Sequence, residues 1–335
     1  MLLVSAEDDG AWLIVPDGQL STAKANANVT NIFVTETLNT FESTDPAGSL
    51  EQALAATFAE AGLSNGRGVF AVEARTLPLF VGRWLNKALP RWVQVEADAA
   101  LQRARWIKTD REIDLLRHAS RVSDAAQQAL TEQTKQAGLS EFELFAEITR
   151  RAFAAAGRDI PLSGELVTGP RTTTVLYPNG PRDRVTEAGD AALMDLSGRV
   201  NGYWFDCTST HVIAAEPTAD QRRYGRAAVA ACEAAMGALK PGAKARDAFA
   251  AAEAAFASFG LPMAHYAGHQ IGVTVNEFPR LVPYDDRTIE PGMVFSVEPG
   301  AYQGEGGTFG ARAEKMVLVT ESGPEILSDF AWGID

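Results

Sequence analysis

Cysteine and clustered positive charge are both scarce in this chain of 335 residues. Its two cysteines, Cys207 and Cys232, can form at most one disulfide, and a chain of this length does not need one for stability. We therefore expect a reduced, cytoplasmic protein. The formal net charge is -13 and no run of lysine or arginine occurs, which argues against a nucleic-acid partner because such binding depends on clustered cations.

Long apolar runs are absent as well. No stretch approaches the roughly 18 to 20 uninterrupted apolar residues that span a bilayer, so no membrane partner is expected. The first ten residues, "MLLVSAEDDG", carry no basic segment and do not resemble a secretory signal.

The composition that remains, 46% hydrophobic over 335 residues, predicts a folded protein of two domains. Residues 1–106 alternate short apolar runs typical of strands ("AWLIV", "NIFVT", "GVFAVEA", "PLFVGRWL") with an alanine-rich helical stretch near 49–62, which suggests a small α/β domain. The second domain is predicted to cover residues 107–335.

Two helices are predicted to open the second domain. Apolar residues recur at three- and four-residue spacing from Ile113 to Leu130, and Asp110 is the predicted N-cap of this helix. Ser140 begins a capping-box signature for the next helix, which Gly157 closes.

The rest of the second domain reads as strands around one alanine-rich helix pair, roughly 218–239 and 245–259. Strand signals resume at "IGVTV", "GMVFSVEP" and "AEKMVLVT". This order predicts an α+β domain in which helices flank an antiparallel or mixed sheet.

A predicted hairpin carries the first candidate site residues. Asn201-Gly202 is a strong two-residue turn signal, and Asp195 and Asp206 on either side of it fall on the same face of the paired strands. Two carboxylates at that range repel each other unless a cation lies between them. The alternative is a bulged hairpin that turns one aspartate to solvent.

Histidines supply the next candidates. His265 and His269 are four residues apart, but two neighbouring glycines and the β-branched run at 273–275 argue against a helix, so both need not bind the same ion. A lone histidine is more often a structural residue than a ligand. His118 and His211 are interpreted as structural or surface residues.

Two glutamates complete the set. Glu298 ends an apolar strand, and Glu314 lies in another strand on the side that carries apolar residues, where a carboxylate needs a cation or a metal. Arg312 is an alternative partner for Glu314. Taken together, four carboxylates and one imidazole suit two divalent ions such as manganese, cobalt or zinc.

The order of these residues resembles the "pita-bread" metallopeptidases, a family that includes methionine aminopeptidases, aminopeptidase P, prolidase and creatinase. The eleven-residue separation of the aspartates agrees with the family pattern, as do "GH..G", "EPG" and "R.E". The resemblance covers residues from about 107 to 328, and "IKTDREIDLLRHA" is similar to the start of the Xaa-Pro peptidase branch. The five matching metal ligands are Asp195, Asp206, His269, Glu298 and Glu314.

The resemblance implies a pita-bread catalytic domain after a small creatinase-type α/β domain, two divalent metal ions with manganese foremost, and a homodimer. The substrate would be a short peptide with proline after the scissile bond, attacked by a water that bridges the ions. Glu298 would act as general base as well as ligand, His265 would line the substrate side, and Arg312 would orient the ligands.

The sequence departs from the family at two substrate-side positions. Asn276 stands where the family usually has a histidine that contacts the scissile carbonyl, and Tyr177 stands where it usually has another active-site histidine. Asparagine can donate a hydrogen bond but cannot carry a proton near neutral pH, while tyrosine titrates near pH 10.

These departures leave two further functions open. The same fold and metal site can act on a small non-peptide compound, as in ectoine hydrolases and dimethylsulfoniopropionate lyases. A binding module without catalysis, as in a histone-chaperone subunit of this fold, is disfavoured because clustered carboxylates without a metal would leave buried charges uncompensated.

Overall fold

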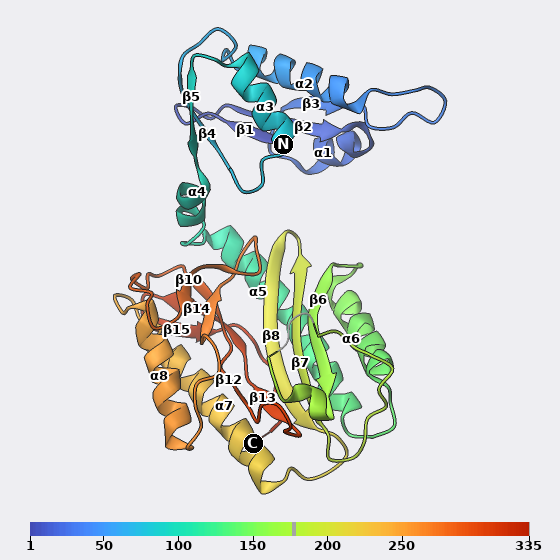
Figure 1. The fold of residues 1–335 in the computed structure, drawn as a ribbon, viewed down its shortest axis with the longest axis vertical. Coiled ribbons are helices and arrows are strands. Elements are labelled where there is room, and N and C mark those ends of the chain that lie inside the picture. Colours follow the sequence, from blue (N-terminus) through green and yellow to red (C-terminus); the bar gives the residue numbers. More distant parts are fainter. Residues whose placement is uncertain (176–178, 335) are drawn as a thin grey trace. The chain divides into compact units, whose positions relative to one another are not determined.

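A computed structural model of the chain describes residues 1–175 and 179–334. The chain divides into two compact units, Met1–Leu101 and Gln102–Asp335, coloured from blue to red along the sequence (Figure 1). The boundary between them lies inside a short helix, and the sequence-based boundary at residue 106 remains a prediction. Within the described ranges, no helix combines the length and the apolar character needed to cross a membrane.

The N-terminal unit is a small α/β fold with two sheets. Its three-stranded sheet has the order β1-β2-β3, and β4 and β5 form a parallel pair. Its strands are β1 (Leu2–Val4), β2 (Ala11–Pro16), β3 (Asn31–Thr35), β4 (Gly68–Val72) and β5 (Trp92–Glu96). Its helices are α1 (Leu20–Asn26), α2 (Pro46–Glu60), α3 (Leu79–Ala88), α4 (Asp98–Ala104) and the 3-10 helix η1 (Asp17–Gln19).

The run "PLFVGRWL" forms helix α3, so its interpretation as a strand was wrong. Val81 and Leu85, four residues apart, are both buried in the hydrophobic cluster of this unit beside Leu54 and Phe58. In a helix, residues four apart lie on the same face, whereas the shortest spacing that brings two residues to the same face of a strand is two.

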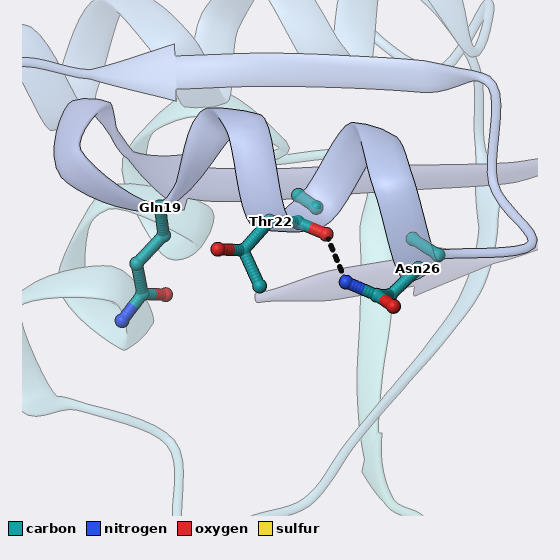
Figure 2. Close-up of a pocket in the computed structure, with 5 residues that line it drawn as sticks. Gln19, Thr22 and Asn26 are labelled. Carbon is teal, nitrogen blue, oxygen red and sulfur yellow. Dashed lines mark hydrogen bonds between the residues drawn. The ribbon is translucent and has the colours of Figure 1, made fainter.

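A shallow hollow lies along α1 (Figure 2). The side-chain amide of Asn26 donates to the carbonyl of Thr22 at 2.9 Å there. Its lining residues carry no ionisable side chain: Gln19, Thr22, Ala23, Asn26 and Ala27. The hollow therefore offers no group for acid–base or metal chemistry.

The described residues of the C-terminal unit form three antiparallel sheets and two helix pairs. The helices are α5 (Asp110–Gln133), α6 (Glu141–Ala156), α7 (Ala219–Ala238) and α8 (Ala245–Ser258), and a short 3-10 helix η2 spans Gly169–Thr172. The first sheet contains β6 (Leu162–Thr168), β7 (Ala191–Val200) and β8 (Tyr203–Val212).

The second sheet of this unit has the order β10-β9-β11-β14-β15, and the third contains β12 and β13. The strands of the second sheet are β9 (Gly268–Gln270), β10 (Glu277–Leu281), β11 (Val294–Val297), β14 (Lys315–Thr320) and β15 (Gly323–Ile326). The small sheet consists of β12 (Gly300–Tyr302) and β13 (Gly310–Arg312). In Figure 1, α5 and α6 lie beside the first sheet, whereas α7 and α8 lie beside the strands from residue 268 onward.

The N-cap of helix α5 lies one residue before the predicted one. Thr109, not Asp110, is the N-cap: its hydroxyl accepts from the Glu112 amide, and the Glu112 carboxylate accepts from the Thr109 amide. This reciprocal pair satisfies two helix-end donors. The predicted capping box of α6 at Ser140 and its left-handed end at Gly157 are confirmed.

The predicted hairpin is confirmed. Strands β7 and β8 pair from Ala191↔Val212 to Val200↔Tyr203, which leaves a two-residue turn. Asn201 and Gly202 both have positive φ, 51° and 90°, the geometry of the turn that matches strand twist.

The run "IGVTV" is not a strand, contrary to the sequence prediction. Strand β9 ends at Gln270, and the next strand begins at Glu277. Between them the Gly272 carbonyl accepts from the Trp204 amide, and the Thr274 amide donates to the Glu277 carboxylate. These partners replace a strand ladder, so the β-branched residues form a turn.

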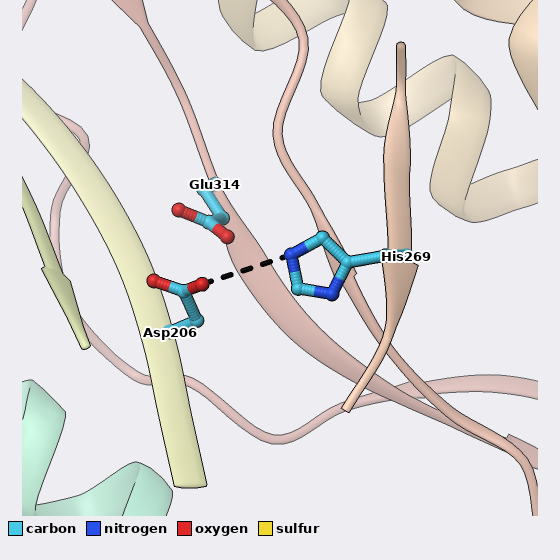
Figure 3. Close-up of side chains that lie close together, drawn as sticks. All are labelled: Asp206, His269 and Glu314. Carbon is cyan, nitrogen blue, oxygen red and sulfur yellow. Dashed lines mark ion pairs between the residues drawn. The ribbon is translucent and has the colours of Figure 1, made fainter. Parts of the chain in front are cut away.

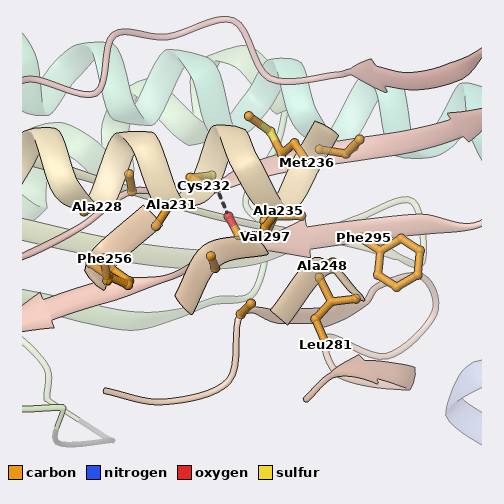
Figure 4. Packing of buried hydrophobic residues seen from close by; sticks show 14 of the residues in the cluster. Ala228, Ala231, Cys232, Ala235, Met236, Ala248, Phe256, Leu281, Phe295 and Val297 are labelled. Atoms are coloured by element: carbon orange, nitrogen blue, oxygen red, sulfur yellow. Dashed lines mark hydrogen bonds between the residues drawn. The ribbon is translucent and has the colours of Figure 1, made fainter. Parts of the chain in front are cut away.

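Alanine-rich helices α7 and α8 pack closely on the strands beneath them (Figure 4). Small side chains such as Ala231 and Ala235 of α7 are fully buried, and the Cys232 thiol donates to the Val297 carbonyl at 3.1 Å. A second cluster joins α5 and α6 to β7 and β8. These two clusters hold the strands that carry the candidate site.

Candidate metal centre

The five predicted ligands come together from five segments of the C-terminal unit. Their side-chain donors form two groups in which all ligand atoms lie within 4.8 Å of one another. One group contains Asp206, His269 and Glu314, which face one another in Figure 3. The other contains Asp195, Glu298 and Glu314, so Glu314 belongs to both.

Strand pairing explains this assembly. Strand β11 lies between β9 and β14, with Ser296 opposite His269, so the residues that follow β11 and precede β14 reach the same place. The hairpin is tied to this sheet because the Ser296 hydroxyl donates to the Asp206 carbonyl at 3.0 Å and the Glu314 amide donates to the Thr208 carbonyl at 3.0 Å.

Within the hairpin, the two aspartates share one face. Asp195 lies opposite Thr208, and Asp206 lies opposite Ser197, so the aspartates are diagonal neighbours. No bulge interrupts this register, and the alternative of an aspartate turned out by a bulge is not observed between these described strands.

Glu314 lies between β13 and β14 rather than inside a strand, which corrects the sequence prediction. It is fully buried, and its Oε2 accepts from the Thr208 hydroxyl at 2.6 Å. Arg312 is not its partner: the guanidinium donates instead to Asp195 at 2.7 Å and to Glu165 at 2.5 Å.

The crowded carboxylates change one another's pKa values. Burial, and then the charges of Asp195 and Glu298, raise the pKa of Asp206 well above its usual range. Burial, and then Asp206 and Glu298, do the same to the pKa of Glu314. Burial also opposes the charged form of Glu298, but the hydrogen bond and charge of His269 outweigh it and lower its pKa.

Two buried carboxylate oxygens at this centre fit the requirements of a divalent cation. Asp195 Oδ1 and Glu314 Oε1 are buried without a hydrogen-bond partner, although a buried polar atom normally has one. Carboxylate oxygens and imidazole nitrogen are common ligands of manganese, cobalt and zinc. The donor set and its unpaired oxygens therefore fit a metal centre.

His269 presents one nitrogen to this centre. Its Nδ1 lies 2.9 Å from the Gln270 carbonyl, and since a carbonyl only accepts, Nδ1 carries the proton. Nε2 lies 3.1 Å from Glu298 and 3.7 Å from Asp206. With Nδ1 turned to the Gln270 carbonyl, Nε2 is the ring nitrogen that faces the carboxylates and is placed to bind an ion.

A chain of hydrogen bonds links His265 to Arg312. His265 Nδ1 donates to the Tyr266 carbonyl, so Nε2 accepts from the Tyr302 hydroxyl at 3.2 Å. Arg312 in turn donates to the Tyr302 oxygen at 3.2 Å. Burial lowers the pKa of His265, which keeps its ring neutral and consistent with this direction.

Lys108 forms hydrogen bonds with residues in strand β9, which carries His269, and in the neighbouring strand β10. Its buried ammonium donates to Gln270 at 2.6 Å and to Glu277 at 3.0 Å, and Glu277 fastens the turn before β10 through Thr274. This turn carries Asn276, which is exposed. The network was not predicted, because one lysine and one glutamate 169 residues apart give no local signal.

Two further site residues lacked a sequence signal. Tyr302 follows "EPG" in an apolar run, and Glu165 stands in "LSGELVT" without a motif around it. Their importance depends on tertiary partners. The predicted substrate-side residue Tyr177 lies outside the described residues.

Comparison with known proteins decides the family. The sequence profile of metallopeptidase family M24 matches residues 114–321. The chain belongs to metallopeptidase family M24.

Among the relatives of this M24 chain, a probable dipeptidase PepE of Mycobacterium tuberculosis is 35% identical over 232 residues. That match covers 68% of this chain and 60% of the relative. An Xaa-Pro dipeptidase of Pyrococcus furiosus is 30% identical over 234 residues, covering 69% of this chain and 65% of the relative. The chain thus aligns with less than two thirds of the length of each relative.

The solved prolidase from Pyrococcus furiosus superposes on this M24 chain with a TM-score of 0.79 and 25% identity, over 96% of this chain and 88% of the prolidase. The match confirms the predicted fold class, which is an α+β pita-bread domain preceded by a small α/β domain.

Proposed function

We propose that this M24 chain is a metal-dependent Xaa-Pro peptidase that hydrolyses the bond before proline in dipeptides or short peptides. One observation carries the proposal: five ligand side chains form two groups that share Glu314, the arrangement that two neighbouring ions require. The names of the relatives, dipeptidase PepE and Xaa-Pro dipeptidase, support the choice of substrate.

We assign the metal ligands to Asp195, Asp206, His269, Glu298 and Glu314. Two divalent ions, with manganese first and cobalt or zinc as alternatives, would lower the pKa of water and polarise the scissile carbonyl. A carboxylate shared by both groups suits a pair of ions, since one oxygen can serve each.

Protein side chains would manage the protons and the substrate. Glu298 lies within one of the two ligand groups, where its carboxylate can accept a proton as general base. His265, held neutral by burial and by the Tyr302 hydroxyl, can orient a substrate polar group. Asn276 can donate one hydrogen bond to a developing oxyanion.

The test uses protein stripped of metal and reloaded with manganese, cobalt or zinc. Release of free amino acid from an Xaa-Pro dipeptide and an Xaa-Pro tripeptide would be measured, with Glu298→Gln as the inactive control. Metal-dependent cleavage is expected, and the preferred length distinguishes dipeptidase from aminopeptidase P. Metal uptake without any cleavage would contradict the proposal.

Asn276 is the observation behind a second candidate, a hydrolase or lyase of small non-peptide compounds with the same metal centre. Asparagine cannot transfer a proton as the usual histidine does, which lowers the expected rate on peptides. Turnover of a small amide in the absence of peptide cleavage would favour this candidate.

The homodimer and the cytoplasmic location rest on the sequence and the family resemblance, and both are part of this proposal. Sedimentation of the full chain would test the dimer.

A further inference from the structure

Glu165 is a buried carboxylate beside the candidate centre that has no place in the ligand set. It lies on β6 directly opposite Asp195 on β7, and its side chain is only 6% exposed. Two carboxylates directly opposite each other on neighbouring strands repel, so this pairing is costly without a cation. A charge in this position needs a specific partner.

Arg312 supplies that partner. A single guanidinium nitrogen, Nη2, donates to Glu165 Oε2 at 2.5 Å and to Asp195 Oδ2 at 2.7 Å. The arginine side chain is 3% exposed, so it cannot exchange these bonds for water without movement. Because Oδ2 of Asp195 is engaged, Oδ1 is the oxygen left without a partner.

The backbone next to Glu165 allows strands β6 and β7 to approach each other closely at this point. Gly164 has a φ of +130°, and a Cβ on it would lie 2.0 Å from the Asp195 carbonyl oxygen. Only glycine tolerates that position, so the two strands can approach closely where their carboxylates face each other.

The charges also balance. Four ligand carboxylates would offset two divalent ions, whereas Glu165 offsets Arg312. Without Glu165, the arginine charge would act on Asp195 alone and compete with an ion for its carboxylate.

We propose that Glu165 is a positioning residue for the metal centre: it holds and neutralises Arg312, so that Asp195 keeps the charge and orientation needed to bind an ion. This inference rests on the metal centre of the proposed function. It concerns ion affinity, which is measured without substrate.

The experiment titrates Mn²⁺ calorimetrically into the metal-stripped full chain. Glu165→Gln is expected to weaken binding of at least one ion about ten-fold, the usual size of a loss from a residue behind the ligands. Glu165→Met, which needs no hydrogen bond, should lose as much and serves if the glutamine variant does not fold. Glu165→Asp should recover part of the affinity.

Asp285→Asn is the matched control, because Asp285 is also buried and paired with an arginine, Arg287, at 2.6 Å, outside the ligand groups. It should bind Mn²⁺ like the wild type. Wild-type affinity in a folded Glu165→Gln or Glu165→Met variant, or an equal loss in the control, would overturn the inference and leave the proposed peptidase standing. A wild-type protein that binds no Mn²⁺ would overturn both.

Discussion

Glu314 is the single side chain on which both ligand groups depend. Burial, and then the charges of Asp206 and Glu298, raise its pKa, so in the absence of a cation the charged form of its carboxyl group is disfavoured. A divalent ion would offset these charges and stabilise the folded chain through binding.

Glu314→Gln is therefore expected to reduce the uptake of both ions, whereas Asp206→Asn should mainly affect the group that contains His269. In the wild type, Mn²⁺ at a hundred times its dissociation constant should add about 2.7 kcal/mol per site to the free energy of unfolding. Metal analysis and thermal unfolding would measure both effects. Unchanged stoichiometry in Glu314→Gln would contradict the shared role.

His211 gives stability a dependence on pH. It is buried beside Ser209, and burial lowers its pKa to about 4, below the value of about 6.5 expected in the unfolded chain. The unfolded chain therefore takes up the proton first as pH falls. Stability is fully present above pH 6.5 and is lost between about 6.5 and 4, by about 2 kcal/mol at pH 5.

Urea unfolding of His211→Gln at pH 5 and pH 8 would measure this contribution. The variant should lose about 2 kcal/mol less than the wild type between the two conditions. His118→Gln, on α5 outside this contact, is the control and should keep the wild-type difference. An identical pH dependence in all three proteins would remove His211 as the cause.

At the scale of single residues, the sequence predicted site residues that belong to a motif. It did not predict residues whose role depends on a hydrogen bond or ion pair with another site residue. The five candidate ligands were named from the family resemblance that their order and spacing carry. Glu165, Tyr302 and Lys108 were missed because their partners lie far along the chain, and neither alternation nor composition reveals a partner.

Among the elements, the turn between β9 and β10 is supported by a buried ion pair. Lys108 precedes α5, and its ammonium reaches Glu277 at the start of β10, with side-chain exposures of 1% and 7%. Removal of one member of a buried ion pair leaves the other charge without compensation.

Lys108→Met should lower the free energy of unfolding by about 3 kcal/mol, because the Glu277 charge remains buried. The double variant Lys108→Met/Glu277→Gln should recover part of that loss. Urea unfolding of the two variants and the wild type would measure the difference. A single variant within about 0.5 kcal/mol of the wild type would show that the ion pair does not stabilise this turn.

Elements with a local signal were predicted well. The Asn201-Gly202 hairpin and the capped helix at Ser140 follow from neighbouring residues alone. The failures at "IGVTV" and "PLFVGRWL" arose where β-branched or apolar composition was outweighed by tertiary hydrogen bonds or by a four-residue burial pattern.

On the scale of the whole molecule, the buried clusters divide between the two units. The cluster around Leu54 and Phe58 contains only residues of Met1–Leu101, and the other two clusters lie in Gln102–Asp335. Each unit thus has a core of its own.

We expect Leu54→Ala to lower the stability of the N-terminal unit by about 2 to 5 kcal/mol, because Leu54 is 2% exposed. Mn²⁺ should raise only the transition of the C-terminal unit, where the ligand groups lie. Calorimetry of the full chain would resolve the two transitions. A single transition that both perturbations shift together would show that the cores unfold as one.

The two buried cysteines give the chain internal reporters of motion. Cys207 directly follows Asp206, and Cys232 contacts the Val297 carbonyl, one residue before Glu298. Burial raises the pKa of both thiols, that of Cys207 to about 12, so an alkylating reagent meets almost no thiolate until the packing around each cysteine opens. The labelling rate of Cys207 would therefore report how often β8, which carries Asp206, opens, and that of Cys232 how often α7 separates from β11, which precedes Glu298.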